Sequence, residues 1–451
     1  MPAPGGATGG GRRRPRTGRP AHKALFAAPC ANPSRGYVVT HGSQFCTDSY
    51  LVALDDIVRP RSGRVSGRSP EDGTPAMTCV MTGGAGFLGL HLVRDRLLRG
   101  RHVTVLAHAG GAPGRERIER FLAATGEMGR LPAPLGELLT VIPVDIEQPL
   151  LGLPRLEHRR LARIAAEVWH VAASVELNGR DERLRRTNVL GTQHVLRLAS
   201  LAARGTPLRH VSTAFVAGTR QGHVSEDDVP ISGNGSGNGS GDGFENAYER
   251  SKHEAEELVR EWAERLGRRA LILRPGVLVP PGPRTVPELP SHTLSTLYRA
   301  ASRLPDTGGR TVLRVGADPR ARLNLLPVDW AADAMARIAS GDRTARVSTV
   351  HIVHPDDVPV RTIAAALEDV CPVRIRMTPA MPAEPTAIEG IFYRRITGFL
   401  PYLHHRRSFD DSTLRKLAPG LAPPPPIDRT YLRSCFGVHA PAAGAAAKTS
   451  A

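Results

Sequence analysis

The stretch Val80–Gly89, with the sequence Val-Met-Thr-Gly-Gly-Ala-Gly-Phe-Leu-Gly, constrains the fold of this chain more than any other segment. An apolar run precedes its three evenly spaced glycines, Gly83, Gly86 and Gly89, and a helical pattern, Leu88–Arg99, follows them. In a strand–turn–helix unit, the first glycine permits a tight turn, the second lets backbone N–H groups approach a pyrophosphate, and the third allows close packing. Because the positive end of the helix favours phosphates, the stretch predicts a dinucleotide site.

Strand and helix patterns alternate along the chain from Thr78 onward. The expected strands are Cys79–Met81, Val103–Ala107, Leu139–Pro143, Val168–Val171, Leu208–Ser212 and Ala270–Leu273. The expected helices lie near Leu88–Arg99, Glu116–Thr125, Arg160–Ala166, Asn188–Ala203 and Tyr248–Leu266. Such alternation is typical of an α/β fold, so we predict a doubly wound parallel sheet of the Rossmann type.

Composition divides the chain into parts of different character. Residues 1–76 are rich in Gly, Pro, Arg and Ser and are expected to form a disordered extension. Residues 77–280 are expected to form the Rossmann domain that binds NAD(P). Residues 281–440 are expected to form a smaller, mostly carboxyl-terminal substrate-binding region, with a return segment (323–354) to the Rossmann domain. The Ala-rich residues 441–451 are expected to be a disordered tail.

Two further features of this organisation leave alternatives open. Met77 stands just before the first strand, so the preceding tail is either dispensable or an artefact of start-codon choice. The Gly-, Ser- and Asn-rich segment Ser232–Gly243 is expected to be a flexible loop. This loop could be a mobile lid over the site, or it could simply be a flexible, solvent-exposed linker.

The strongly basic composition does not by itself indicate a nucleic-acid partner. The net charge is +17, but only four of the 60 basic residues are lysines, so the excess is arginine spread along the chain. No zinc-finger spacing or aromatic RNA-binding pattern accompanies it. We expect no nucleic-acid partner, although a basic surface could help an anionic partner to dock.

Cysteine usage and hydropathy favour a cytoplasmic protein. The five cysteines are far apart and form no Cys-x-x-Cys pair, which indicates reduced thiols. No apolar run approaches the roughly 20 residues that a membrane span requires. The basic run Arg12–Arg14 is followed only by the short apolar patch Ala24–Ala28, which is too short for a usual signal sequence.

Tyr248 and Lys252 open a helical pattern and lie four residues apart in Tyr-Glu-Arg-Ser-Lys. This spacing places them on one helix face, about 6 Å apart along the axis. A nearby ammonium favours the phenolate, so we expect it to lower the pKa of the tyrosine from about 10 toward neutrality. A surface helix that merely carries both residues is the alternative. With seven tyrosines and four lysines in the chain, this pairing rarely arises by chance.

A hydroxyl beside Tyr248 would be needed to bind a substrate carbonyl oxygen. Ser212 and Thr213 end an apolar strand and face opposite ways, so only one of them can meet the tyrosine. The residues alone leave that choice open, and either could instead cap a helix or form a turn. Asn188 begins the helix expected under this site, where its amide could hold a water in a proton relay or act as an N-cap.

Taken together, these motifs resemble the extended short-chain dehydrogenase/reductases. Within them the chain is most similar to the thioester reductase and fatty acyl-CoA reductase branch, with its male sterility type of NAD-binding domain. The resemblance runs from about Thr78 to about Val438. Its markers are TGGAGFLG at 82–89, WHVAASVELN at 169–178, TNVLGT at 187–192, HVSTAFVAG at 210–218, FENAYERSKHEAEELV at 244–259, LRPGVLVP at 273–280 and LLPVDWAADAM at 325–335.

The resemblance implies a role for each residue at a matching position. Thr213 falls on the catalytic Ser/Thr, Tyr248 on the proton donor, and Lys252 on the residue that lowers its pKa and contacts the nicotinamide ribose. Asp145 falls on the residue that holds the adenine amino group. The catalytic set is Thr213, Tyr248, Lys252 and Asn188. The cofactor-binding set is Gly83, Gly86, Phe87, Leu88, Gly89, His108, Arg117, Asp145, Ile146, Ala172, Ala173, Tyr248, Lys252 and Pro275.

One departure from the family pattern bears on the cofactor. The branch usually places an arginine after the second strand to bind the 2′-phosphate of NADPH, and here the residues are Leu106, Ala107 and His108. No acidic residue stands there to favour NADH through the ribose hydroxyls. Because His108, Arg115 or Arg117 could supply the positive charge, NADPH is the preferred cofactor and NAD is possible.

The resemblance implies an NADPH-dependent reductase of acyl thioesters, including fatty acyl substrates of lipid metabolism. Its substrate would be carried by coenzyme A or an acyl carrier protein, and its product would be an aldehyde or an alcohol. A dehydrogenase or epimerase acting on a secondary alcohol, either sterol-like or a nucleotide sugar, is the alternative within oxidoreductases. A non-catalytic NADP-binding sensor is the alternative from another class, but a sensor would need neither Tyr248 nor Lys252.

The histidines do not predict a metal site. His351 and His354 lie around a strand end, and His404 and His405 lie in a basic loop. Neither set has carboxylate or cysteine partners at metal-ligand spacing, so no metal is expected.

Overall fold

The computed structural model describes residues 77–110, 114–228, 243–282, 290, 292–305, 308–341 and 345–437. The extension 1–76, residues 232–242 of the glycine-rich loop and the tail 441–451 lie outside the described residues. The predictions made for those three segments therefore stay predictions.

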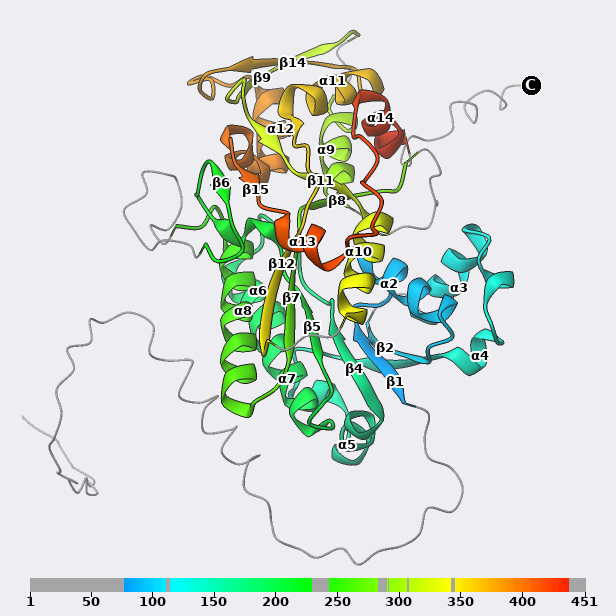
Figure 1. The fold of residues 1–451 in the computed structure, drawn as a ribbon. Helices are drawn as coiled ribbons and strands as arrows, with labels where there is room; N and C mark the ends of the chain where they lie inside the picture. Colours follow the sequence, from blue (N-terminus) through cyan, green and yellow to red (C-terminus); the bar gives the residue numbers. More distant parts are fainter. Residues whose placement is uncertain are drawn as a thin grey trace, which may run out of the picture. The chain divides into compact units, whose positions relative to one another are not determined.

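A seven-stranded parallel sheet forms the centre of the described chain (Figure 1). Its order is β12-β7-β5-β4-β1-β2-β3. The chain first adds β2 and β3 on one side of β1 and then adds β4 and the later strands on the other side, as in a doubly wound fold. The strands are β1 (Thr78–Thr82), β2 (Val103–His108), β3 (Leu139–Val144), β4 (Ala165–His170), β5 (Leu208–Val211), β7 (Ala270–Pro275) and β12 (Val347–Ile352). The predicted Rossmann-type sheet is confirmed, and β12 adds a strand beyond the six that were expected.

Helices pack in two groups around this sheet (Figure 1). Helix α10 contacts α2, whereas α5 and α8 both contact α7. The bounds are α2 (Phe87–Leu98), α3 (Gly114–Ala124), α5 (Arg155–Ile164), α7 (Gly191–Leu201), α8 (Ala247–Leu266) and α10 (Val328–Ser340). Helix α8 shows how local sequence sets such bounds. The side chain of Asn246 accepts from the backbone of Glu249 at its start, and Gly267 adopts a left-handed φ of 60° at its end.

Two helix predictions need correction. The helix expected over Arg160–Ala166 is α5, Arg155–Ile164, and Ala165 already begins β4. Asn188 does not begin a helix, because it lies in the π-helical turn η3 (Arg185–Leu190). This turn follows α6 (Asp181–Leu184) and leads directly into α7. Since helical backbone lies on both sides of Asn188, the N-cap interpretation is wrong.

A second hydrophobic core, which includes Leu294, Leu313, Val373, Phe392 and Phe436, is built mainly by the carboxyl-terminal part of the chain. Strands β9 and β14 pair in parallel there, far apart in sequence. The elements of this part are α9 (Thr293–Ser302), β9 (Thr311–Gly316), α11 (Val360–Val370), β14 (Val373–Thr378), α12 (Ala387–Ile396), η5 (Thr397–Phe399), η6 (Pro401–His404), α13 (Ser412–Leu417) and α14 (Arg429–Gly437).

In the described part of the chain, three short strand pairs lie outside the central sheet, and one of them, β8 with β11, has residues in both cores. Strand β8 pairs with β11, β10 with β13, and β6 with β15. Their bounds are β6 (His223–Val224), β8 (Val277–Val279), β10 (Arg322–Leu323), β11 (Leu325–Pro327), β13 (Val358–Pro359) and β15 (Ser408–Phe409). The other short elements are η1 (Met128–Arg130), α4 (Leu135–Leu138), η2 (Pro149–Gly152) and η4 (Ala214–Ala217). The functional division at about residue 280 stays a prediction.

None of the helices in the described ranges has the length and apolar character needed to cross a bilayer. Cys79, Cys371 and Cys435 are buried free thiols, and burial raises the pKa of each above its ordinary value.

Candidate active site

A cavity of about 980 Å³ opens at the carboxyl ends of the central strands. Residues that directly follow β1, β4 and β5 line it, as do the last residues of β2, β3 and β7. It brings together nearly all of the residues predicted from the sequence. Those that line it are Gly83, Gly86, Phe87, Leu88, Gly89, His108, Arg117, Asp145, Ile146, Ala172, Ala173, Thr213, Tyr248, Lys252 and Pro275.

Because the key positions of the glycine loop have no side chains, a bound group can lie directly against its backbone. Gly83 has a φ of +71°, and a Cβ atom there would lie 2.5 Å from the backbone nitrogen of Ala172. A Cβ on Gly89 would lie 2.0 Å from the carbonyl oxygen of Gly83. Gly86 precedes α2 without a side-chain cap, so the N–H groups of the first helical turn face the cavity end of the helix. This arrangement fits the diphosphate of a dinucleotide.

The expected adenine end lies beyond β3. Asp145 follows that strand, and its Oδ1 accepts a hydrogen bond of 2.9 Å from the backbone of Glu147. The carbonyl of Ile146 is hydrogen-bonded to Nδ1 of His194 at 2.8 Å. These contacts fix the loop that carries Asp145 and Ile146, two of the predicted cofactor-binding residues.

Only two of the three candidates for binding a 2′-phosphate line the cavity. His108 and Arg117 line the cavity, and Nη1 of Arg117 donates to the carbonyl of Ala85 at 3.2 Å. Arg115 is not among the residues that line the cavity, because its guanidinium donates to the carbonyl of Leu139 and pairs with Glu119 at 3.0 Å. His108 and Arg117 are therefore the groups that could bind a phosphate here.

The side chains of Thr213 and Tyr248 lie close enough to interact, and both line the cavity. Thr213 follows β5, and its Oγ1 also accepts from the backbone of Phe215 at 3.2 Å. That bond makes Thr213 the N-cap of η4 and fixes the hydroxyl. Of the alternatives Ser212 and Thr213, the geometry thus pairs Thr213 with the tyrosine.

Lys252 is buried and turned toward the end of β5, where its Nζ donates to the carbonyl of Val211 at 2.7 Å. Burial lowers the pKa of Lys252 to about 8, against an opposing effect of the Glu256 carboxylate. This value keeps the lysine mostly protonated at neutral pH.

Burial raises the pKa of Tyr248 well above its usual 10, and the neighbouring carboxylate of Glu249 raises it further. The hydrogen bond with Thr213 acts in the opposite direction but is the smaller effect. The expectation that Lys252 draws this pKa toward neutrality is therefore wrong for this structure, because desolvation of the ring dominates. A phenol in this state keeps its proton and can donate it to a developing oxyanion.

Asn188 does not line the cavity but lies buried behind it. Its Oδ1 accepts from the backbone N–H of Ser174 at 2.8 Å, and its Nδ2 donates to the carbonyl of Ser174 and to Oγ of Ser251. Ser251 in turn donates to the carbonyl of Tyr248 at 2.8 Å. The side chain thus ties the loop after β4 to the helix of Tyr248, and its proposed relay role stays a prediction.

His170 is a buried residue whose position the sequence reasoning did not assign to the site. Its Nδ1 is 2.8 Å from Oγ1 of Thr82, and its Nε2 is 2.9 Å from Oγ1 of Thr192. Burial lowers the pKa of His170 to about 3, so the ring is neutral at ordinary pH. Since Thr82 directly precedes Gly83, the ring fixes the start of the glycine loop. Its place in the WHVAAS motif was the signal that could have identified it.

The far end of the cavity has an apolar and aromatic wall that the sequence analysis did not identify. The apolar and aromatic residues that line the cavity include Leu177, Phe215, Leu323, Phe399 and Tyr402. The aromatic rings of Phe215 and Tyr402 meet edge to face with 5.3 Å between their centroids. This end therefore suits an apolar group better than a charged one.

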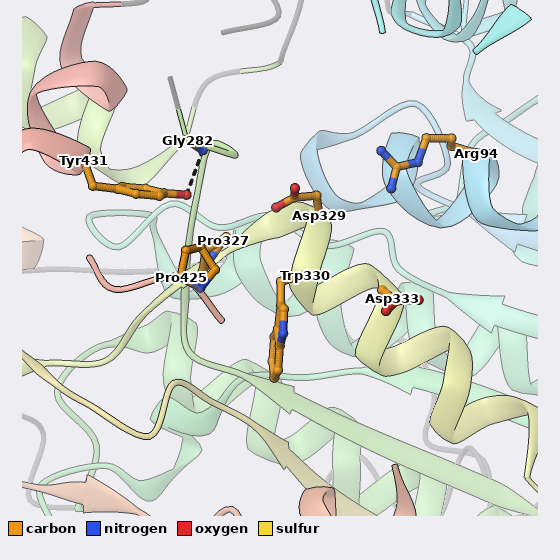
Figure 2. A pocket seen from close by; sticks show the side chains of 8 residues that line it. All are labelled: Arg94, Gly282, Pro327, Asp329, Trp330, Asp333, Pro425 and Tyr431. Carbon is orange, nitrogen blue, oxygen red and sulfur yellow. Dashed lines mark hydrogen bonds between the residues drawn. The ribbon is translucent and has the colours of Figure 1, made fainter. Parts of the chain in front are cut away.

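A second cavity, of about 500 Å³, lies between α10 and α14 and contains none of the predicted residues (Figure 2). Helix α10 contributes two carboxylates and an indole, and Arg94 of α2 lies across from them (Figure 2). Its lining residues are Arg94, Gly282, Pro327, Asp329, Trp330, Asp333, Pro425 and Tyr431. The Tyr431 hydroxyl accepts from the backbone of Gly282 at 2.9 Å and donates to the carbonyl of Pro280, so it holds chain segments together.

Among the residues that the structure describes, no three His, Cys, Asp or Glu side chains are grouped so as to hold a metal ion. The histidines considered above are engaged elsewhere. His351 contacts the carbonyl of Asp410, His354 that of Pro425, and His405 the carboxylate of Glu245.

Comparison with known proteins agrees with this geometry. The family model for an NAD-binding domain described as "Male sterility protein" matches residues 81–335, more than half of the chain. Among curated proteins, the carboxylic acid reductase of Mycobacterium marinum is 25% identical over 357 residues, covering 76% of this chain and 29% of that protein. The large subunit of L-2-aminoadipate reductase from Eremothecium gossypii is 27% identical over 325 residues, covering 69% of this chain and 22% of that protein. The chain spans less than a third of the length of these relatives.

Solved structures share the fold. The terminal R domain from the myxalamid PKS-NRPS biosynthetic pathway superposes with a TM-score of 0.61 at 24% identity, covering 81% of this chain and 91% of that one. A UDP-galactose 4-epimerase superposes with a TM-score of 0.52 at 19% identity, covering 80% of this chain and 97% of that one. At these identities the likeness establishes the α/β architecture alone.

Proposed function

Because this chain belongs to the male sterility protein family of NAD-binding domains, we propose that it is an NADPH-dependent reductase of acyl thioesters. The observation that carries the proposal is that one cavity is lined both by the glycine loop and by the neighbouring side chains of Thr213 and Tyr248. The relatives named as a carboxylic acid reductase and an L-2-aminoadipate reductase support a substrate at the carboxylic acid oxidation level.

In this proposal the chain's own residues hold the cofactor along the cavity. The glycine loop and the first turn of α2 bind the diphosphate, and Asp145 and Ile146 contact the adenine. Ala172 and Ala173 contact the central part of the cofactor through their backbone. Pro275 and Lys252 contact the nicotinamide end, where the Lys252 ammonium binds the ribose. When bound, NADPH supplies a hydride to the carbonyl carbon of the thioester.

Thr213 and Tyr248 act on the carbonyl oxygen of the substrate. Both hydroxyls donate hydrogen bonds to the oxyanion that develops as the carbonyl carbon is reduced. Tyr248 then gives its proton to that oxygen, and the resulting hemithioacetal breaks its carbon–sulfur bond to release an aldehyde and a free thiol. The raised pKa of Tyr248 supports this role, because a phenol must be protonated to act as the donor. A second reduction by the same groups would give the alcohol.

His108 and Arg117 are the basis for proposing NADPH over NADH. Both line the cavity near the end of β2, where the ribose 2′ position of a bound dinucleotide is expected. No acidic residue stands at the end of β2 to bind ribose hydroxyls. A positive charge from the guanidinium of Arg117 would bind a 2′-phosphate.

The apolar wall supports an acyl substrate over a nucleotide sugar. A nucleotide sugar presents many hydroxyls and a second diphosphate, whereas Leu177, Phe215 and Leu323 present only apolar surface. The adjacent hydroxyls of Thr213 and Tyr248 in the cavity also support a catalyst over a sensor, since cofactor binding alone would not require them.

A cofactor-oxidation assay with a substrate panel tests this function. The panel contains short- and long-chain acyl-CoAs, acyl-pantetheines as carrier mimics, simple ketones and a nucleotide sugar, each with NADPH and with NADH. We expect NADPH oxidation with the thioesters, together with release of a free thiol that a thiol reagent detects. Oxidation with ketones or nucleotide sugars and none with any thioester would contradict the proposal.

A further inference from the structure

A buried polar cluster lies directly beside Tyr248, outside the predicted site. Its members come from the segment around the start of α8 and from the chain segment that follows α12. They are Glu245, Asn246, Glu249, Tyr402, His405 and Arg407. Glu249 is fully buried, and Arg407 and Tyr402 are 3% and 7% exposed. Burying groups this polar is costly, and hydrogen bonds among the members offset part of that cost.

The hydroxyl of Tyr402 is fixed from two sides by the N-terminus of α8. It accepts a hydrogen bond of 2.8 Å from Nδ2 of Asn246 and donates one of 2.6 Å to Oε1 of Glu249. Asn246 also caps the helix through the backbone N–H of Glu249 at 3.0 Å. The other carboxylate oxygen of Glu249 accepts from the backbone of Glu245 at 2.9 Å. Tyr402 is therefore tied to the same helical turn that carries Tyr248.

Arg407 supplies the positive charge of this cluster. Its guanidinium lies over the rings of Phe215 and Phe409, 5.0 and 5.8 Å from their centroids, and donates to the carbonyl of Gly218. Burial raises the pKa of Glu249 to about 7, and the charge of Arg407 opposes that rise. In this arrangement Oε1 of Glu249 accepts the hydrogen bond from Tyr402.

The ring of Tyr402, unlike its hydroxyl, faces the candidate active site. It lines the 980 Å³ cavity together with Thr213 and Tyr248, and it packs edge to face on Phe215. Phe215 is in turn fixed to the catalytic hydroxyl, because its backbone donates to Oγ1 of Thr213. Phe215 is thus adjacent to the Thr213 hydroxyl, and the Tyr402 ring packs against Phe215 in the same cavity.

We propose that Tyr402 is a specificity-determining residue, whose ring is held by Asn246 and Glu249 against Phe215 and limits the bulk of the acyl group next to the thioester carbonyl. The preferred substrates are accordingly linear acyl thioesters, and those with a methyl branch on the first carbon are rejected. This inference rests on the proposed function for the identity of the substrate. It adds a size limit that the catalytic residues do not impose.

The test compares linear and α-methyl acyl-CoAs in wild type, Tyr402→Phe and Tyr402→Ala. Removing the ring opens space beside the carbonyl, so Tyr402→Ala should raise the branched-to-linear ratio of kcat/KM by about tenfold or more. Tyr402→Phe keeps the ring but loses its hydrogen bonds to Asn246 and Glu249, so it should raise the ratio by less than Tyr402→Ala does. Tyr393→Phe, which removes a buried hydroxyl bonded to the Arg314 carbonyl outside the cavity, is the matched control for loss of a hydroxyl.

Binding of non-reducible thioether analogues of the same acyl groups, measured by calorimetry, provides a second readout. The same change of ratio is expected in the dissociation constants of Tyr402→Ala, with unchanged affinity for NADPH as the check that the variant is folded. An unchanged ratio in a Tyr402→Ala variant that still reduces thioesters overturns the inference and leaves the proposed function intact. A wild type that binds the analogues with the expected selectivity but reduces no thioester overturns the proposed function instead.

Discussion

Tyr248 and Lys252 share one helix face, but burial affects the two groups in opposite directions. It raises the pKa of the phenol and lowers that of the ammonium to about 8, because the charged form of each group is the one that loses its hydration. The pair consequently consists of a protonated phenol and a lysine that is close to titrating. In the proposed mechanism, the first donates the proton and the second binds the ribose.

The buried lysine predicts how stability depends on pH. The folded-state pKa of Lys252, about 8, lies below the ordinary value of 10.5, so the unfolded chain binds more protons between these values. The free energy of unfolding should therefore rise with pH between about 8 and 10, by about 1–3 kcal/mol relative to a Lys252→Met variant. Denaturant titrations of both proteins at several pH values measure the difference.

Lys416→Met is the matched control for this experiment, because Lys416 lies on the exposed face of α13. Its difference from wild type should not change over the same pH interval. A flat difference for Lys252→Met as well would show that Lys252 is not desolvated in the folded chain.

At the scale of elements, the glycine loop and α2 form one unit with the loop after β4. Gly83 approaches Ala172 so closely that no side chain fits between them, and His170 is hydrogen-bonded to Thr82, the residue before the loop. The proposed cofactor-binding loop is therefore formed by closely packed backbone, and side chains such as His170 hold that backbone in place.

Gly89→Ala tests that cradle. Its Cβ would lie 2.0 Å from the carbonyl oxygen of Gly83, so the helix or the loop must shift, and the affinity for NADPH should fall by about tenfold or more. Gly129→Ala in η1 is the control, because nothing lies within 4 Å of a Cβ at that position and its affinity should equal that of wild type. Fluorescence titration with NADPH measures both. Equal affinities for the two variants would contradict the assignment of the glycine loop.

For the whole described chain, local sequence patterns predicted the central sheet well. Its strands are short apolar runs between turn residues, and each lies next to the helix that connects it, so the alternation is visible in sequence. The second core could not be predicted this way. Its strands β9 and β14 pair across a long sequence separation, with Thr311 opposite Val373, and no local pattern encodes such a pairing.

The candidate site likewise contains some residues that the sequence could place and others that it could not. Gly83, Thr213 and Tyr248 belong to short motifs and could be placed from the sequence. Tyr402 could not, because its place in the cavity depends on contacts with Asn246 and Phe215 more than 150 residues earlier in the chain. The direction of the Tyr248 pKa was also beyond the sequence, since spacing predicts proximity to Lys252 but says nothing about burial.

The most direct measurement of the central claim compares Tyr248→Phe with wild type in single-turnover NADPH oxidation with an acyl-CoA. If Tyr248 is the proton donor, the rate should fall by about 100-fold or more in this variant, while the affinity for NADPH stays the same. Tyr298→Phe, a buried tyrosine of α9 outside the cavity, should keep the wild-type rate. A Tyr248→Phe variant that reduces the thioester at the wild-type rate would contradict the account.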